Sequence, residues 1–300
     1  MWRQVLIKIK LLLNIKIKTN KDKPSRWDKV TAGYWKSICY PWRPNKNEQN
    51  IFSFFIKEKR NKIDNDYKSL LLGSTPEIRD IFARNNLSLD VVDSSKNMYQ
   101  TMKAFCRSNE KEYYFQQDWI SFLSDKKDEY DQIIGDLPLR LLSNKKVFLL
   151  GKYIIHSLKI NGDLILRSHF VKPSQINRKK SHAEILKIVR QLESAMLSNN
   201  EVIDRLFFLF SACFVKKNNK VDINTMKIFL NQMLLNLKSK KLKMLIKLLI
   251  NKWIHPSSVF FVRSRREEHQ AFSQLLHPIK TRIFSLFDNQ TIEIALWRKL

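Results

Sequence analysis

The chain has 300 residues, of which 44% are hydrophobic, 5 are glycine and 8 are proline, so a disordered or fibrous chain is excluded and a packed globular core is expected. Its formal net charge of +27 comes from 55 Lys and Arg against 28 Asp and Glu, and such a positive field attracts nucleic acid or anionic lipid. Because lysines occur along the whole length, a coding bias that places them on ordinary solvated faces explains the charge equally well.

Residues 1–18 are apolar and basic, with lysines interrupting the apolar stretch. No small-residue cleavage site follows, so a secretory signal fits poorly. The longest apolar run elsewhere, Leu206 to Val215, is too short to cross a membrane. We therefore predict a soluble, cytoplasmic protein without a transmembrane segment. Residues 1–18 are expected to form an unstructured or strand-like extension, with contact to anionic head groups as the alternative.

The three cysteines, Cys39, Cys106 and Cys213, are widely spaced and form neither a Cys-x-x-Cys pair nor a cluster with histidine. This pattern predicts inert free thiols in a reducing compartment and no metal site. Residues 20–50 combine three prolines with five Trp and Tyr residues, which indicates an irregular, aromatic-rich lead-in. We assign residues 1–60 to a basic N-terminal extension followed by this lead-in, which acts as a cap.

From Ser69 onward, short apolar runs alternate with helical patterns, which is typical of βαβ units in a mostly parallel sheet. The predicted strands are Ser69–Gly73, Ser88–Asp93, Glu112–Gln117, Tyr130–Asp136 and Gly162–Phe170. The predicted helices between them are Pro76–Asn85, Lys96–Cys106 and Asn144–Leu158. With right-handed crossovers, these units predict a Rossmann-like α/β core over residues 61–177, with a doubly wound sheet.

After Pro173 the alternation stops, and apolar residues recur at helical spacing up to Trp253. We predict a helical insertion over residues 178–254, whose long helices from His182 to Trp253 pack as a lid or substrate subdomain. Residues 255–300 are expected to complete the core. They contain one amphipathic helix and a terminal antiparallel hairpin, predicted at Arg265–His277, Arg282–Asp288 and Thr291–Lys299.

The first predicted strand ends at Gly73, where the backbone must turn sharply and let a ligand approach. Ser74 or Thr75 suits the N-cap of the following helix, and Pro76 suits its first turn. Ser74 and Glu77 also fit a capping box. A helix N-terminus at the carboxyl end of a first parallel strand is a place where polar or anionic ligand groups bind.

Acidic residues stand at the ends of the next three strands. Asp93 follows Gly73 by twenty residues, the spacing at which an acid accepts hydrogen bonds from both ribose hydroxyls, although an acid that caps the next helix is the alternative. Asp118 could accept from an exocyclic amine, and Trp119 offers a flat apolar surface for a purine. Asp136 points from the fourth strand toward the same crevice.

Together, residues 69–140 resemble the cofactor half of class I S-adenosylmethionine-dependent methyltransferases. The likeness is to a bacterial subgroup with a Gly-x-Thr-Pro-Glu first motif, because Gly73-Ser74-Thr75-Pro76-Glu77 is followed by Val92-Asp93-Ser94-Ser95-Lys96-Asn97-Met98. The resemblance implies S-adenosylmethionine as the cofactor, with its amino-acid end at the first turn. The cofactor-binding residues are then expected to be Gly73, Ser74, Thr75, Pro76, Asp93, Ser94, Met98, Asp118, Trp119 and Asp136.

The segments Ala32-Gly33-Tyr34-Trp35 and Pro41-Trp42-Arg43-Pro44 also resemble the lead-in that covers the cofactor site in such proteins. We therefore expect Trp35 and Trp42 to face the crevice, and we assign Trp35, Trp42 and Arg43 to the substrate side. The acidic residue that often precedes the first glycine by two positions is Leu71 here. Contact with the cofactor's ammonium group is accordingly assigned to Glu77 or Asp136.

Asp136-Leu137-Pro138-Leu139 lacks the aromatic ring of the Asp/Asn-Pro-Pro-Tyr motif, which disfavours methylation of base amines. Methyl transfer depends mostly on positioning, so a base is needed only for a protonated acceptor. Asp136 and Tyr34 are the candidates, while His169 fits a packed structural histidine better. We predict a methyltransferase for a small molecule. The alternatives are an RNA or protein methyltransferase that uses the basic surface, and a non-catalytic binding protein with the same fold.

Overall fold

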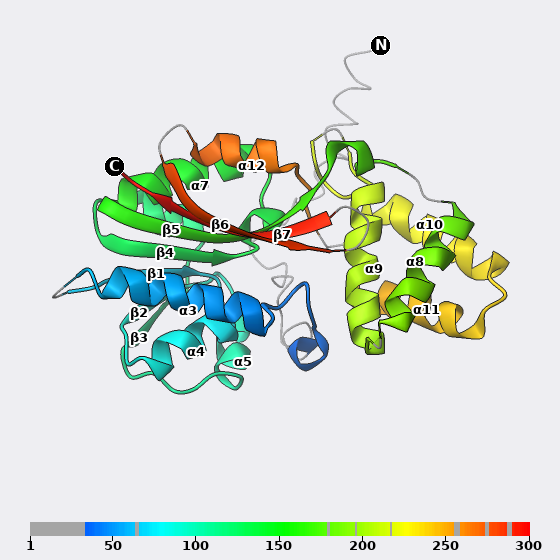
Figure 1. Ribbon diagram of the computed structural model, residues 1–300, viewed down its shortest axis with the longest axis horizontal. Coiled ribbons are helices and arrows are strands. Elements are labelled where there is room, and N and C mark those ends of the chain that lie inside the picture. Colours follow the sequence, from blue (N-terminus) through cyan, green and yellow to red (C-terminus); the bar gives the residue numbers. More distant parts are fainter. Residues whose placement is uncertain are drawn as a thin grey trace, which may run out of the picture.

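The computed structural model describes residues 34–63, 66–178, 181–195, 197–216, 218–254, 259–273, 276–286 and 290–300. The predictions for residues 1–18 and for residues 32 and 33 fall outside these described residues. Figure 1 shows a twisted sheet with helices on both faces and a separate group of helices beside one end of the sheet. No helix in the described ranges is long and apolar enough to cross a membrane.

The sheet has the strand order β3-β2-β1-β4-β5-β7-β6. Its first five strands are parallel: β1 (Ser69–Leu72), β2 (Leu89–Val92), β3 (Glu112–Phe115), β4 (Tyr130–Asp136) and β5 (Leu158–Val171). The chain proceeds from β1 outward to β3 on one side, and then from β4 to β5 on the other. The sheet is therefore doubly wound with its switch point between β1 and β4, which confirms the predicted fold class.

Helices α3 (Lys46–Arg60) and α4 (Pro76–Arg84) cover one face of the sheet. Phe52 and Phe55 of α3 and Phe82 of α4 are buried against strand residues such as Leu71. Helix α3 was not predicted from the sequence, although Asn45 and Glu48 form a capping box at its start. This capping box was therefore a usable signal in the sequence. Helix α5 (Lys96–Lys103) adds Tyr99 to the same cluster.

Helices α6 (Trp119–Ser124), α7 (Asn144–Ser157) and α12 (Arg265–Phe272) cover the opposite face. Leu70 and Leu72 of β1 point to this face because side chains alternate along a strand. Every residue of β1 is buried, as expected for a parallel strand with helices on both sides. The predicted helix Asn144–Leu158 ends one residue early, and β5 starts directly at Leu158.

The antiparallel pair at the C-terminus consists of β6 (His277–Ser285) and β7 (Gln290–Arg298), with β7 between β5 and β6. The predicted helix Arg265–His277 was too long, because the helix stops at Phe272 and the strand already begins at His277. Pro278 accounts for the extended backbone at His277, the last residue of the predicted helix. A proline disfavours helical backbone in the residue before it and is tolerated on an edge strand such as β6.

The helical group consists of α8 (His182–Ser194), α9 (Asn199–Cys213), α10 (Ile223–Asn236) and α11 (Lys240–Trp253), and it follows β5 after the 3-10 turn η3 (Pro173–Gln175). We call α8 to α11 the cap. Its apolar residues form one continuous cluster with the lead-in, which supplies Trp35, Ile38 and Trp42. Buried Asp204 of α9 accepts hydrogen bonds from the backbone N–H of Cys39 and from Trp253 Nε1. The lead-in is thus held between the cap and the sheet.

Glu268 of α12 provides a test of the charges buried between α12 and the sheet. Burial raises its pKa from an ordinary 4.5 to about 7, and Ser168 and Arg263 oppose the change. A raised pKa means that the fold favours the protonated form of Glu268. The protonated carboxyl group therefore stabilises the fold below pH 4.5, and this contribution is lost as the pH rises through 7. We expect Glu268→Gln to raise the free energy of unfolding at pH 8 by on the order of 3 kcal/mol and to leave it unchanged at pH 4.5. Urea unfolding at the two pH values measures this difference.

Glu267 is the matched control for this prediction. Its carboxylate accepts hydrogen bonds from Ser264 and Asn219, and its pKa is lowered in spite of partial burial. Glu267→Gln should therefore destabilise the protein near neutral pH, with the difference disappearing as the pH falls. An identical pH dependence of the two variants would contradict the assigned protonation of Glu268.

Candidate functional site

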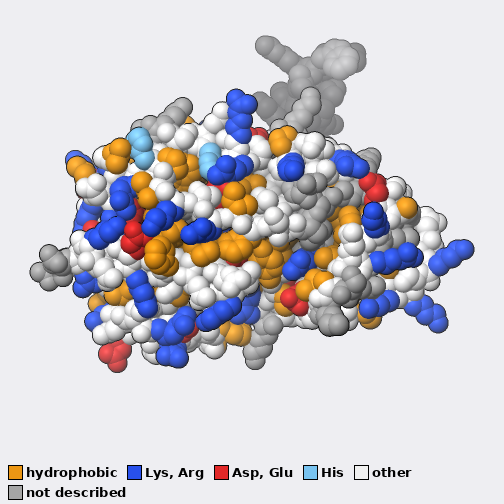
Figure 2. Space-filling view, viewed as in Figure 1, with side chains coloured by type: hydrophobic (Ala, Val, Ile, Leu, Met, Phe, Trp, Pro, Cys, Tyr) orange, Lys and Arg blue, Asp and Glu red, His pale blue; other side chains and the backbone are white. Residues whose placement is uncertain are grey.

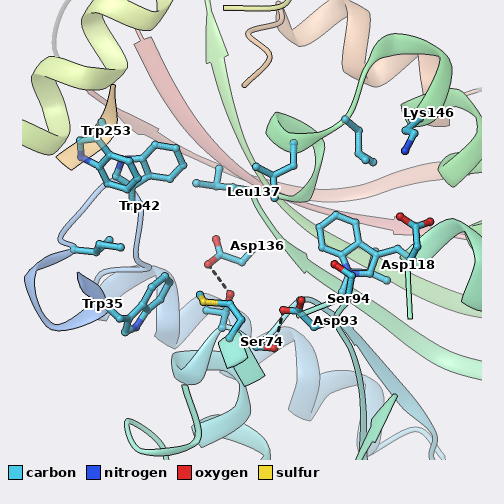
Figure 3. Close-up of a pocket in the computed structure, with 18 residues that line it drawn as sticks. Trp35, Trp42, Ser74, Asp93, Ser94, Asp118, Asp136, Leu137, Lys146 and Trp253 are labelled. Atoms are coloured by element: carbon cyan, nitrogen blue, oxygen red, sulfur yellow. Dashed lines mark hydrogen bonds between the residues drawn. The ribbon is translucent and has the colours of Figure 1, made fainter. Parts of the chain in front are cut away.

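A cavity of about 280 Å³ lies at the switch point of the sheet, beyond the carboxyl ends of β1 and β4. This volume is close to the lower bound of roughly 300–1,000 Å³ for small-molecule sites. The cap and the lead-in close the side opposite the strands (Figure 3). The described residues that line the cavity are Trp35, Ile38, Trp42, Leu72, Gly73, Ser74, Thr75, Asp93, Ser94, Met98, Asp118, Trp119, Asp136, Leu137, Leu141, Leu142, Lys146 and Trp253.

The turn after β1 connects two of the strand ends. Gly73 has φ of +97°, a backbone conformation that residues with a Cβ rarely adopt, so the glycine is required here. Ser74 Oγ donates to Asp93 Oδ2 at 2.8 Å, and Thr75 Oγ1 donates to Asp136 Oδ2 at 3.0 Å. The turn therefore positions both carboxylates relative to each other.

These hydrogen bonds correct the predicted capping of α4. Thr75 is the N-cap residue, but its side chain makes no capping bond, and the predicted box between Ser74 and Glu77 does not form. Glu77 instead pairs with Arg43, whose Nε lies 2.6 Å from Glu77 Oε1. The two hydroxyls find stronger acceptors in ionised carboxylates across the turn than in the backbone of their own helix.

Asp93 lies at the end of β2 with one face toward the cavity. Besides Ser74, it accepts a hydrogen bond at Oδ1 from the backbone N–H of Ser95 at 2.9 Å. Burial raises the pKa of the carboxyl group, while these two hydrogen bonds oppose the rise. Each carboxylate oxygen can accept a second hydrogen bond, so Asp93 keeps acceptor capacity toward the cavity.

Asp118 and Trp119 form the wall beyond β3. Asp118 Oδ1 accepts from the backbone N–H groups of Ile120 and Ser121, so the aspartate caps α6. Trp119 Nε1 donates to the carbonyl of Val92 at 3.0 Å, which fixes the plane of its ring. The indole also lies against the first turn, with Cζ2 3.7 Å from the position that a Cβ on Gly73 would occupy. A flat, fixed apolar surface therefore stands beside the two acids Asp93 and Asp118.

Asp136 belongs to a buried group of three charges. Arg167 of β5 donates to Asp136 Oδ1 at 2.9 Å and lies 3.1 Å from Glu48 Oε2. Burial raises the pKa of both carboxyl groups, Arg167 opposes the rise in each, and the charge of Asp136 raises the pKa of Glu48 further. With all three ionised, the group carries one excess negative charge at the floor of the cavity. We call these residues the Glu48–Arg167–Asp136 triad.

The residue after Asp136 has an unusual backbone. Leu137 has φ of 52°, in the left-handed region that costs a leucine on the order of 1–2 kcal/mol. Its N–H donates to the carbonyl of Arg167 at 2.9 Å, and the 3-10 turn η2 (Pro138–Leu141) follows. This turn brings Leu137 and Leu141 into the cavity wall. Strain of this kind at a cavity is typical of functional sites.

The lead-in and cap supply an aromatic wall. Trp42 stacks on Trp253 with ring centroids 4.6 Å apart, and Trp35 lies on the same side of the cavity (Figure 3). Phe208 and Phe260 pack around Trp42 and hold it from behind. Trp42 and Trp253 are therefore each packed against several aromatic rings.

The predicted site residues fall into two groups. Gly73, Ser74, Thr75, Asp93, Ser94, Met98, Asp118, Trp119, Asp136, Trp35 and Trp42 line the cavity, whereas Pro76, Glu77 and Arg43 are not among its lining residues. His169 is buried between Arg140 and Gln290 and also lies outside the lining. The side chain of Tyr34 falls outside the described part of the chain. The roles of these residues stay predictions.

Seven described lining residues were not predicted from sequence: Ile38, Leu72, Leu137, Leu141, Leu142, Lys146 and Trp253. Trp253 is distant in sequence from every predicted site segment, and only the packing of α11 on α9 brings it to the cavity. Lys146 is the single basic residue among the described lining residues and lies on the same side of the cavity as Asp118 (Figure 3). Of the lining residues, three are acidic and one is basic, so the cavity favours a ligand with net positive charge.

No family model matches this chain, and no curated protein matches it. A methyltransferase from Methanosarcina mazei, described as S-adenosylmethionine-dependent, is similar in structure with a TM-score of 0.49 and 14% identity over 80% of this chain and 96% of its own. The N-methyltransferase NodS from Bradyrhizobium japonicum, solved with S-adenosyl-L-homocysteine, has a TM-score of 0.47 and 8% identity. The match covers 91% of this chain and 99% of the NodS chain. At these values, the ligand and the reaction must be argued from the residues of the site.

Proposed function

We propose that this protein binds S-adenosylmethionine and transfers its methyl group to a small molecule. The observation that carries the proposal is the convergence of four consecutive strand ends on one cavity at the switch point. Gly73, Asp93, Asp118 and Asp136 all line it. The first-motif sequence favours the subgroup of class I methyltransferases with Gly-x-Thr-Pro-Glu, which we propose as the family.

The chemistry of the lining residues fits this cofactor. Asp93 retains acceptor capacity for two ribose hydroxyls, and Trp119 offers a fixed flat surface for adenine next to Asp118. The excess negative charge of the Glu48–Arg167–Asp136 triad suits a ligand that carries both a sulfonium and an ammonium group. Of the two residues assigned to the ammonium group from sequence, Asp136 is therefore retained, because it lines the cavity, and Glu77, which lies outside the lining and pairs with Arg43, is not.

When bound, the cofactor supplies a methyl group on a sulfonium that is open to in-line attack. The residues of this chain contribute positioning and a dry environment. Gly73 and the N-terminus of α4 form the cradle for the amino-acid end, and Asp93 holds the ribose. Trp35 and Trp42 close the opposite side and exclude water from the acceptor.

The acceptor side of the cavity is apolar, with Trp35, Ile38, Trp42, Leu137, Leu141 and Trp253 in its wall. Its nearest ionisable group is Asp136, whose two oxygens are already bound to Arg167 and Thr75. We infer that the acceptor is a small apolar molecule, neutral or cationic, that presents its own lone pair and needs no strong base. Three carboxylates in the lining would repel the phosphates of RNA.

Incubating the protein with S-adenosylmethionine labelled on the methyl group, together with a cell extract, tests the proposal directly. We expect label in the small-molecule fraction and cofactor binding that polyanions do not change. Label in RNA or protein would replace the small-molecule acceptor with a macromolecule. Measurable cofactor binding without transfer of label to any fraction would favour the non-catalytic alternative, and a complete lack of binding would contradict the cofactor itself.

A further inference from the structure

The outer surface of the cap carries apolar side chains that no described element covers. On α10, Ile228 is 59% exposed and Leu235 is 82% exposed; on α11, Met244 is 42% and Leu248 is 41% exposed. The spacings of seven and four residues place each pair on one side of its helix. The buried residues of the same helices, such as Leu230 and Ile246, lie on the opposite sides, against the core of the cap. We call the outward sides the α10–α11 face.

The charge of this hairpin has one sign. From Ile223 to Ile254 the sequence contains no Asp or Glu and the lysines Lys227, Lys238, Lys240, Lys241, Lys243, Lys247 and Lys252. Lys252 pairs with Asp204 inside the cap, whereas Lys238, Lys240 and Lys247 are exposed beside the apolar residues. Figure 2 shows basic side chains along the end of the molecule that carries α10 and α11.

Exposed apolar residues flanked by lysines on amphipathic helices match the chemistry of an anionic bilayer surface. Apolar side chains enter the boundary between head groups and acyl chains, and lysines contact the anionic head groups. RNA would use the lysines but would leave Leu235 and Leu248 without an apolar partner. We propose that the α10–α11 face docks on membranes that contain anionic lipid. This proposal goes beyond the proposed methyl transfer and does not depend on it.

Co-sedimentation with vesicles tests the docking. The full-length protein should bind vesicles that contain phosphatidylglycerol, bind pure phosphatidylcholine poorly, and lose binding as salt is added. The variant Leu235→Gln/Lys247→Glu should bind the anionic vesicles at least about tenfold more weakly than the wild type, because it loses one apolar contact and reverses one charge. The vesicles should also protect Met244 from oxidation by peroxide, which peptide mass spectrometry detects.

The control variant Phe148→Gln/Lys152→Glu also replaces one exposed apolar side chain and reverses one charge, but on α7, on another part of the molecule. It should bind vesicles like the wild type. Residues 1–18 are also basic and apolar. If they alone produced vesicle binding, the α10–α11 variant would bind as well as the wild type, which would overturn the proposal. Salt-sensitive binding to RNA without vesicle binding, or self-association lost in the variant without vesicle binding, would also overturn it.

Discussion

Replacing Asp93 by alanine is expected to weaken S-adenosylmethionine binding by about 100-fold or more while the chain stays folded. The carboxylate would supply two charge-assisted hydrogen bonds to the ribose, each contributing on the order of 1.5–3 kcal/mol. It also holds Ser74 Oγ and the N–H of Ser95 in place, so its loss loosens the turn after β1. Titration calorimetry measures the affinity, and circular dichroism with urea unfolding reports whether the variant is folded.

Two further variants separate binding from stability. Asp222→Ala is the control for Asp93→Ala. Asp222 is also an aspartate that accepts a backbone hydrogen bond, from the N–H of Thr225 at the start of α10, but it lies outside the cavity lining. The substitution should cost about 1 kcal/mol of stability and leave cofactor affinity unchanged. Ser74→Ala removes one tie to Asp93 but keeps the carboxylate, so its effect on affinity should be intermediate. A folded Asp93→Ala protein with wild-type affinity would refute the ribose assignment and, with it, the cofactor.

The strand ends could be predicted from sequence because parallel strands present their carboxyl ends at the same edge of a sheet. Once alternating strands and helices were recognised, Gly73, Asp93, Asp118 and Asp136 had to lie near one another, and they line one cavity. The local capping of α4 was predicted wrongly for a related reason. The rules for helix ends consider neighbours in sequence, whereas Thr75 bonds to Asp136 across the switch point.

The partner of Asp136 had no sequence signal. Arg167 lies inside a strand that is otherwise rich in apolar residues, and its second partner, Glu48, belongs to a helix 119 positions earlier. Tertiary packing alone brings the two acids to one guanidinium. Trp253 is a similar case, because its place in the cavity wall depends on how α11 packs on α9. Helical periodicity predicts that such a residue is buried but not which cavity it lines.

The triad makes Arg167 the residue whose loss should destabilise the fold most. Arg167→Met keeps the volume but leaves Glu48 and Asp136 buried without a counter-charge, and it removes the donors to the carbonyls of Pro41 and Arg43. Breaking a buried ion pair by removing one partner costs about 3–5 kcal/mol, which we expect in urea unfolding near neutral pH. The lead-in should loosen as well, because Arg167 holds it to the sheet.

The pH dependence distinguishes unpaired charge from lost packing. Without Arg167, the pKa values of Glu48 and Asp136 should rise further, so the fold would favour the protonated forms of both acids. The loss of unfolding free energy in Arg167→Met would then shrink as the pH falls toward 5. Adding Glu48→Gln to Arg167→Met removes one of the two unpaired charges and should restore part of the stability near neutral pH. If Arg167→Met lost the same unfolding free energy at pH 5 and pH 8, or if Glu48→Gln failed to reduce this loss, Arg167 would contribute packing and not charge. The excess negative charge that we assign to the cavity floor would then lose its physical basis.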